Sequence, residues 1–93
     1  MGSIKVAVRA FALLKERIGT GEVIMYLPEG ATVEQLIEAM GEKYGRDLPN
    51  ILLTRDHELA DDVLVSLDGT RVDAGDPVHE GSLVFFIPPL SGG

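Results

Sequence analysis

The spacing of apolar residues predicts most of the strands and helices of this chain. Apolar and polar residues alternate over residues 4–8, and a period of two is typical of a half-buried strand. Apolar residues then recur at helical spacing from Phe11 to Ile18, and Gly19 follows as a stop, which predicts a short helix or tight turn. Residues 22–27 predict a second strand, which the short connection places antiparallel to the first.

The strongest helical pattern lies in residues 32–44. Thr32 and Gln35 have the spacing of a capping box, in which each residue satisfies a free backbone amide of the other. The apolar residues that follow form one stripe along the predicted helix, namely Val33, Leu36, Ile37, Met40 and Tyr44. The pattern of residues 46–61 is weaker, and we expect a loop with one turn of helix there.

The second half of the chain predicts three more strands, at residues 63–67, 70–72 and 82–87. Asp68-Gly69 is a strong signal for a tight turn between the first two of them. The last segment is apolar on both faces, which predicts a central strand that is covered on both sides. The whole order predicts an α+β fold in a single domain, residues 1–93, with a mixed sheet of about five strands and one main helix across it.

The composition and charge of the chain argue against membrane and nucleic-acid-binding functions. Apolar residues make up 45% of the chain, and no apolar run approaches the roughly 18–20 residues of a membrane span. We expect a cytoplasmic protein without a membrane partner, because no leader pattern is visible. The formal net charge of −7 argues against nucleic acid binding. Between Asp56 and Glu80 there are eight carboxylates, which indicate either a face that attracts a basic partner or a solvated surface.

The end of the chain carries the most distinctive candidate chemistry. Pro88-Pro89 stiffens the exit from the last strand, and we expect residues 90–93 to form a flexible tail. Gly92 and Gly93 have no Cβ, so a narrow active site of a partner can close on their backbone. A terminal carboxylate on such a tether suits activation as an acyl-adenylate. The alternative is a frayed glycine-rich terminus.

Four stretches of the chain resemble the MoaD family, the small subunit of molybdopterin synthase, and more loosely the ThiS sulfur carriers and archaeal ubiquitin-like modifiers. These stretches are residues 4–19, 32–44, 63–69 and 84–93, and the terminal Phe-Phe-Ile-Pro-Pro-Leu-Ser-Gly-Gly is the most specific. The resemblance implies a β-grasp (ubiquitin-like) fold. It also implies two partners: an E1-like enzyme that uses ATP to adenylate the terminal glycine, and the large catalytic subunit of the synthase. We expect no cofactor bound to this chain itself.

The resemblance also implies roles for single residues. Gly93 would carry the acyl-adenylate and then the thiocarboxylate, and Gly92 would give access to it. Phe11, Leu67 and Ile87 match apolar positions that relatives present to their partners, and ordinary core packing is the alternative for all three. The predicted partner-binding set also includes three other residues of the terminal stretch, Phe86, Pro88 and Leu90.

Other candidate sites are weaker. Adjacent residues such as Asp56-His57-Glu58 rarely converge on one ion, so we expect them to be solvated and predict no metal site. No group of acid, base and nucleophile is apparent, so the chain is not expected to be catalytic alone. Three functions remain: a sulfur carrier for molybdenum (or tungsten) cofactor synthesis, a carrier for thiamine, tRNA thiolation or protein lysines, and a β-grasp interaction module without tail chemistry.

Overall fold

A five-stranded mixed sheet forms the body of the protein in the computed structural model, which describes residues 2–87. The strands follow the order β2-β1-β5-β3-β4 across the sheet. Their bounds are β1 Ser3–Ala10, β2 Glu22–Pro28, β3 Leu64–Leu67, β4 Thr70–Arg71 and β5 Leu83–Ile87. Strand β5 runs parallel to β1 and antiparallel to β3, while β1 and β2 form an antiparallel hairpin. This is the predicted α+β, β-grasp arrangement.

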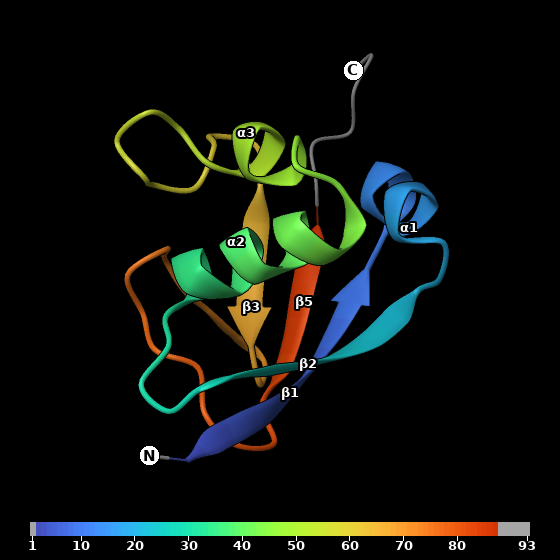
Figure 1. The fold of residues 1–93 in the computed structure, drawn as a ribbon. Helices are drawn as coiled ribbons and strands as arrows, with labels where there is room; N and C mark the ends of the chain where they lie inside the picture. The colour runs from blue at the N-terminus through green and yellow to red at the C-terminus, as the bar shows by residue number, and fades with distance from the viewer. Residues whose placement is uncertain (1, 88–93) are drawn as a thin grey trace.

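Three helices accompany the sheet in the described residues, and they are α1 Ala12–Ile18, α2 Val33–Tyr44 and α3 Leu48–Leu52. Helix α2 lies across one face of the sheet, and α1 and α3 lie near the end at which β1 and β5 finish (Figure 1). The segment after Phe11 is therefore a helix rather than a tight turn. Helix α3 is the single helical turn expected within residues 46–61.

The N-terminus of α2 is stabilised by the capping box that the sequence predicts. The backbone N–H of Gln35 donates to Oγ1 of Thr32 at 3.3 Å, and the N–H of Thr32 donates to Oε1 of Gln35 at 2.8 Å. These bonds satisfy two amides that the helix leaves without internal partners. The start of α2 is thereby determined by residues within its own first turn.

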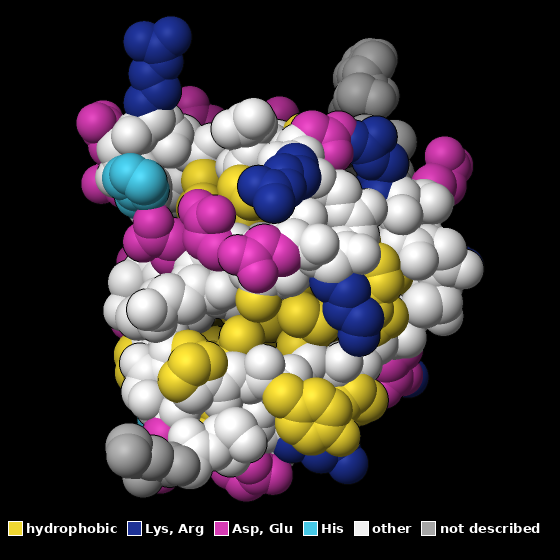
Figure 2. Space-filling model, viewed as in Figure 1, with side chains coloured by type: hydrophobic (Ala, Val, Ile, Leu, Met, Phe, Trp, Pro, Cys, Tyr) yellow, Lys and Arg dark blue, Asp and Glu magenta, His cyan; other side chains and the backbone are white. Residues whose placement is uncertain are grey.

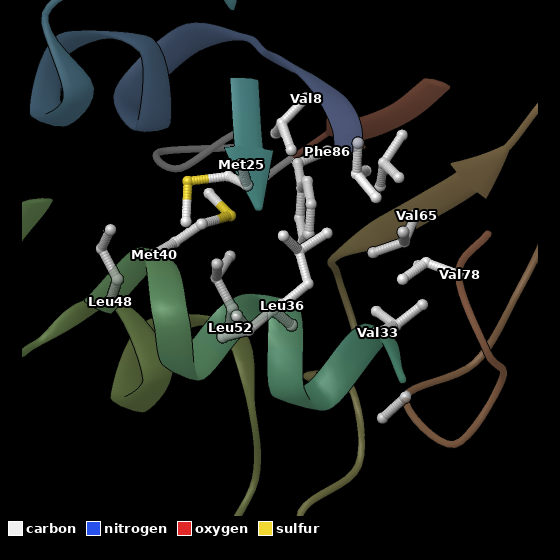
Figure 3. Packing of buried hydrophobic residues seen from close by; sticks show 14 of the residues in the cluster. Val8, Met25, Val33, Leu36, Met40, Leu48, Leu52, Val65, Val78 and Phe86 are labelled. Atoms are coloured by element: carbon white, nitrogen blue, oxygen red, sulfur yellow. The ribbon is translucent and has the colours of Figure 1, made fainter. Parts of the chain in front are cut away.

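The hydrophobic core lies between α2 and the sheet. From α2, the side chains of Val33, Leu36, Ile37 and Met40 are completely buried. They pack against inward-facing residues of the central strands, including Val8, Val65 and Phe86 (Figure 3). Helix α3 closes one side of the core with Leu48 and Leu52.

Strand β5 is central, as predicted, but it is not covered on both faces. Val84 and Phe86 are completely buried against α2, whereas Leu83 and Phe85 are half-buried and Ile87 is exposed. The prediction of a strand covered on both sides was wrong because the helices of the described chain cover only one face of the sheet. An apolar run shows that both faces of a strand are hydrophobic, but it cannot show whether this chain covers both.

Candidate functional site

The C-terminal end of β5 is the point at which the described chain leads toward the terminal glycines. Hydrogen-bonded neighbours hold this strand on both sides, with Ala10 opposite Phe86 in β1 and Leu64 opposite Ile87 in β3. A central strand with two partners is among the most firmly held parts of a sheet, because every one of its backbone groups can be paired. The segment that follows Ile87 is therefore rooted in a rigid part of the molecule.

An exposed apolar surface surrounds this root on the face of the sheet that the helices leave open. We call it the exit patch and define it by Phe11, Leu64, Phe85 and Ile87. Phe11 and Ile87 are each 41% exposed and Leu64 is 40% exposed. The rings of Phe11 and Phe85 lie with their centroids 5.8 Å apart, within the range of favourable aromatic pairs. Contiguous exposed apolar side chains of this kind are typical of protein-binding surfaces.

A charged pair borders the exit patch on the β1–β2 side. The guanidinium of Arg9 lies 5.9 Å from the ring centroid of Phe85, and its Nε lies 3.3 Å from Oε1 of Glu22. Both charged side chains are about half-exposed, so the pair contributes little to stability. Arg9, Phe11, Lys15 and Glu22 also line a shallow depression of about 300 Å³. The patch therefore has an apolar centre and a polar rim, which is the usual composition of a transient interface.

The comparisons with known proteins agree with this architecture. The model of the ThiS family matches residues 8–93, which is most of the chain. The chain belongs to the ThiS family. It therefore has the ubiquitin-like β-grasp fold of the ThiS and MoaD sulfur carriers.

Several solved structures resemble this ThiS-family protein. SAMP1 from Haloferax volcanii is 27% identical, with a TM-score of 0.81, over 96% of this chain and 99% of that one. A candidate molybdopterin converting factor subunit 1 from Pyrococcus furiosus is also 27% identical, with a TM-score of 0.74, over 94% and 99% of the two chains. One chain of the Amycolatopsis orientalis BexX/CysO complex shares the fold at 20% identity and a TM-score of 0.75, over 95% and 99%. No curated protein sequence matches this chain.

The structure separates the predicted partner-binding residues of this ThiS-family protein into two groups. Phe11 and Ile87 lie in the exit patch and are available for contact. Phe86 is completely buried, so its side chain is not available at the surface for contact with a partner. Neighbouring residues of a strand point to opposite faces, and here the face of Phe86 is the core.

Leu67 does not lie in the exit patch. It is half-buried and pairs in register with Val84, which places it on the helix-covered face of the sheet, where it packs against the core. Pro88, Leu90, Gly92 and Gly93 lie outside the described residues, so their predicted roles stay predictions.

Sequence reasoning missed two members of the exit patch, Leu64 and Phe85. Both have apolar neighbours on either side in the sequence, so the period-two pattern that separates inner from outer positions is obscured. The pairing of Leu64 with Ile87 across β3 and β5 supplies the missing information, because paired residues share one face.

No buried group with the parts of an enzyme active site is present among the side chains that the structure describes. Their one buried polar member is Ser82, whose Oγ accepts a hydrogen bond from the backbone N–H of His79 at 3.0 Å. This serine therefore has a structural role in a turn.

Within residues 2–87, no helix has the length and hydrophobicity needed to cross a membrane.

Proposed function

We propose that this ThiS-family protein is a sulfur carrier that acts as the small subunit of molybdopterin synthase in molybdenum (or tungsten) cofactor synthesis. The family match over residues 8–93 supports the carrier role. The similarity to the Pyrococcus furiosus molybdopterin converting factor candidate supports the choice of pathway. In this proposal the reactive group is the carboxylate of Gly93.

The proposed chemistry converts a poor acyl donor into a sulfur donor. A carboxylate resists nucleophilic attack until one of its oxygens becomes part of a good leaving group. An E1-like partner would transfer the AMP moiety of ATP to the carboxylate of Gly93 and release pyrophosphate. Hydrosulfide supplied through the partner would then attack the acyl carbon of Gly93, form the C–S bond and displace AMP, and the product would be a thiocarboxylate. The carrier itself binds no cofactor in this scheme, and ATP belongs to the activating partner.

The observation that carries the proposal is the position of the exit patch beside the end of β5. Six residues follow Ile87, and a fully extended chain of that length spans at most about 20 Å. A partner that binds the exit patch can therefore receive the terminal glycines in an active site within that radius. Because both partners must receive the same terminus, we expect the activating enzyme and the large synthase subunit to compete for the exit patch. The proposal places the protein in the cytoplasm, where ATP is available.

Removal or extension of the terminus tests the proposal directly. We expect deletion of Gly93, or addition of one residue after it, to abolish the exchange of one oxygen for sulfur in the intact mass after incubation with the activating enzyme, ATP and a sulfur donor. Gly75→Ala is a matched control, because no heavy atom lies within 4 Å of the position that the added methyl group would take. Sulfur loading of the shortened chain, or equal support of cofactor synthesis in cells, would contradict the carrier role and leave a simple interaction module.

A second candidate function is covalent modification of proteins. The similarity to SAMP1, a small archaeal modifier protein, favours it. In that case the activated Gly93 would form an isopeptide bond with lysines of target proteins. Blots of an N-terminally tagged chain would show ladders that disappear when Gly92 and Gly93 are removed. Assay of the sulfur-loaded carrier with each acceptor separates molybdopterin synthesis from thiamine synthesis and tRNA thiolation.

A further inference from the structure

Two carboxylates and one imidazole converge on the helix-covered side of the molecule, away from the exit patch. Glu34 and Glu38 lie one turn apart on α2, and His57 lies in the loop between α3 and β3. One ligand atom from each of the three residues lies within 4.8 Å of the others. Figure 2 shows a histidine against acidic side chains on this face of the molecule.

The loop that carries His57 is held in a defined turn. The N–H of Thr54 donates to the carbonyl oxygen of Glu58 at 2.7 Å, and the N–H of His57 donates to the carbonyl oxygen of Thr54 at 3.0 Å. Oγ1 of Thr54 accepts further hydrogen bonds from the backbone N–H groups of Asp56 and Glu58. His57 itself has a left-handed backbone, with φ of 65°. A hydrogen-bonded turn thus presents the imidazole to a helix whose first turn is capped.

The three donors suit a metal ion of the zinc type. Imidazole nitrogen and carboxylate oxygen are common ligands of zinc and related transition metals, whereas magnesium and calcium favour oxygen alone. Metal–ligand distances of about 2.0–2.2 Å place the donor atoms of a tetrahedral site roughly 3.3–3.6 Å apart. Nδ1 of His57 now lies 2.7 Å from Oε2 of Glu34. The side chains of Glu38 and His57 are exposed and can rotate to adjust these separations.

The electrostatic surroundings also favour a cation. The chain has a formal net charge of −7. Asp56, Glu58, Asp61 and Asp73 line the depression of about 650 Å³ that borders Glu34 and His57, and Arg71 is the basic residue of that lining. A concentration of negative charge raises the local concentration of divalent cations. Without a cation, the carboxylates of Glu34 and Glu38 repel each other across one turn of α2.

We infer that Glu34, Glu38 and His57 bind one divalent transition-metal ion, with zinc as the representative ion, and that this ion links α2 to the α3–β3 loop. Three protein ligands leave a coordination position for water or for a partner side chain. The side chain of His57 is 69% exposed, so the ion can enter from solvent. The site lies on the opposite side of the sheet from the exit patch, and the inference is therefore independent of the proposed tail chemistry.

Zinc titration of the full chain without an affinity tag tests the inference by isothermal calorimetry. We expect one zinc ion per chain, and at least about tenfold weaker binding in the His57→Asn variant, since loss of a ligand costs no less than loss of a supporting contact. Asparagine tolerates the left-handed backbone at this position. His79→Asn is the matched control, because His79 is the other histidine and is also exposed. Glu38→Gln and Glu42→Gln form a second pair on the same helix.

The control variants distinguish zinc binding at Glu34, Glu38 and His57 from non-specific zinc binding to the acidic surface. Wild-type affinity in His79→Asn and Glu42→Gln, together with weakened binding in His57→Asn and Glu38→Gln, supports the site. The inference is overturned if the wild-type chain binds no zinc at concentrations up to about 1 mM, a loose affinity for any specific site. Equal binding by His57→Asn and the wild-type chain also overturns it, since the imidazole of His57 then contacts Glu34 without contributing to metal binding.

Discussion

Phe86 and Ile87 are neighbours in β5, and the structure predicts very different consequences for their replacement by alanine. Phe86 is completely buried under α2, and truncation of a buried phenylalanine costs about 3–5 kcal/mol of unfolding free energy. Ile87 is 41% exposed on the open face of the sheet. Full burial of an isoleucine side chain contributes about 1.5–3 kcal/mol to stability. Because Ile87 is only partly buried, we expect Ile87→Ala to lower the free energy of unfolding by roughly 1 kcal/mol.

Urea unfolding followed by far-ultraviolet circular dichroism measures this difference, since the chain has no tryptophan to serve as a fluorescent probe. For a domain of this size the slope of the free energy is about 1–2 kcal/mol per molar urea. A difference of at least about 2 kcal/mol therefore separates the midpoints of the two variants by roughly 1–2 M. We expect Phe86→Ala to have the lower midpoint.

For partner binding we expect the opposite ranking: substitution at Ile87 weakens binding more than substitution at Phe86. Ile87→Asp places a charge in the exit patch and is expected to weaken binding of the large synthase subunit, while the body of the protein stays folded. Phe86→Leu keeps the core apolar and leaves the patch side chains in place, so its folded fraction is expected to bind normally. Equal destabilisation by Phe86→Ala and Ile87→Ala would refute the assignment of the two faces of β5. Normal binding by Ile87→Asp would refute the role of the exit patch.

Three further predictions concern stability and use the same urea assay. Thr32→Ala removes the side-chain cap of α2 and is expected to cost about 1 kcal/mol; no loss would show that the capping box is dispensable. Gly41→Ala is expected to destabilise by about 1–3 kcal/mol although alanine favours helices, because its Cβ would lie 2.7 Å from Cδ of Pro49; a gain in stability would contradict this close approach. Arg9→Ala is expected to change stability by less than about 1 kcal/mol, since its pair with Glu22 is half-exposed; a larger loss would show that Arg9 supports the patch.

The sequence by itself determined the elements whose signals are local. The capping box at Thr32 and Gln35 and the apolar stripe after it predicted α2 at its observed position, because both depend on contacts within a few residues. Alternation predicted β1, and the apolar run of residues 82–87 predicted the central position of β5. The terminal motif, together with these elements, was sufficient to predict the family and the fold of the chain.

The tertiary structure decided which apolar residues are buried and which distant residues meet. Leu67 and Ile87 both end a strand and are both apolar, yet one faces the core and the other faces outward. Glu34 and Glu38 meet His57 only because the α3–β3 loop folds back over α2. The local sequence pattern indicates which residues favour burial. Whether a given side chain is in fact buried depends on how many layers the chain forms and on the register of its strands.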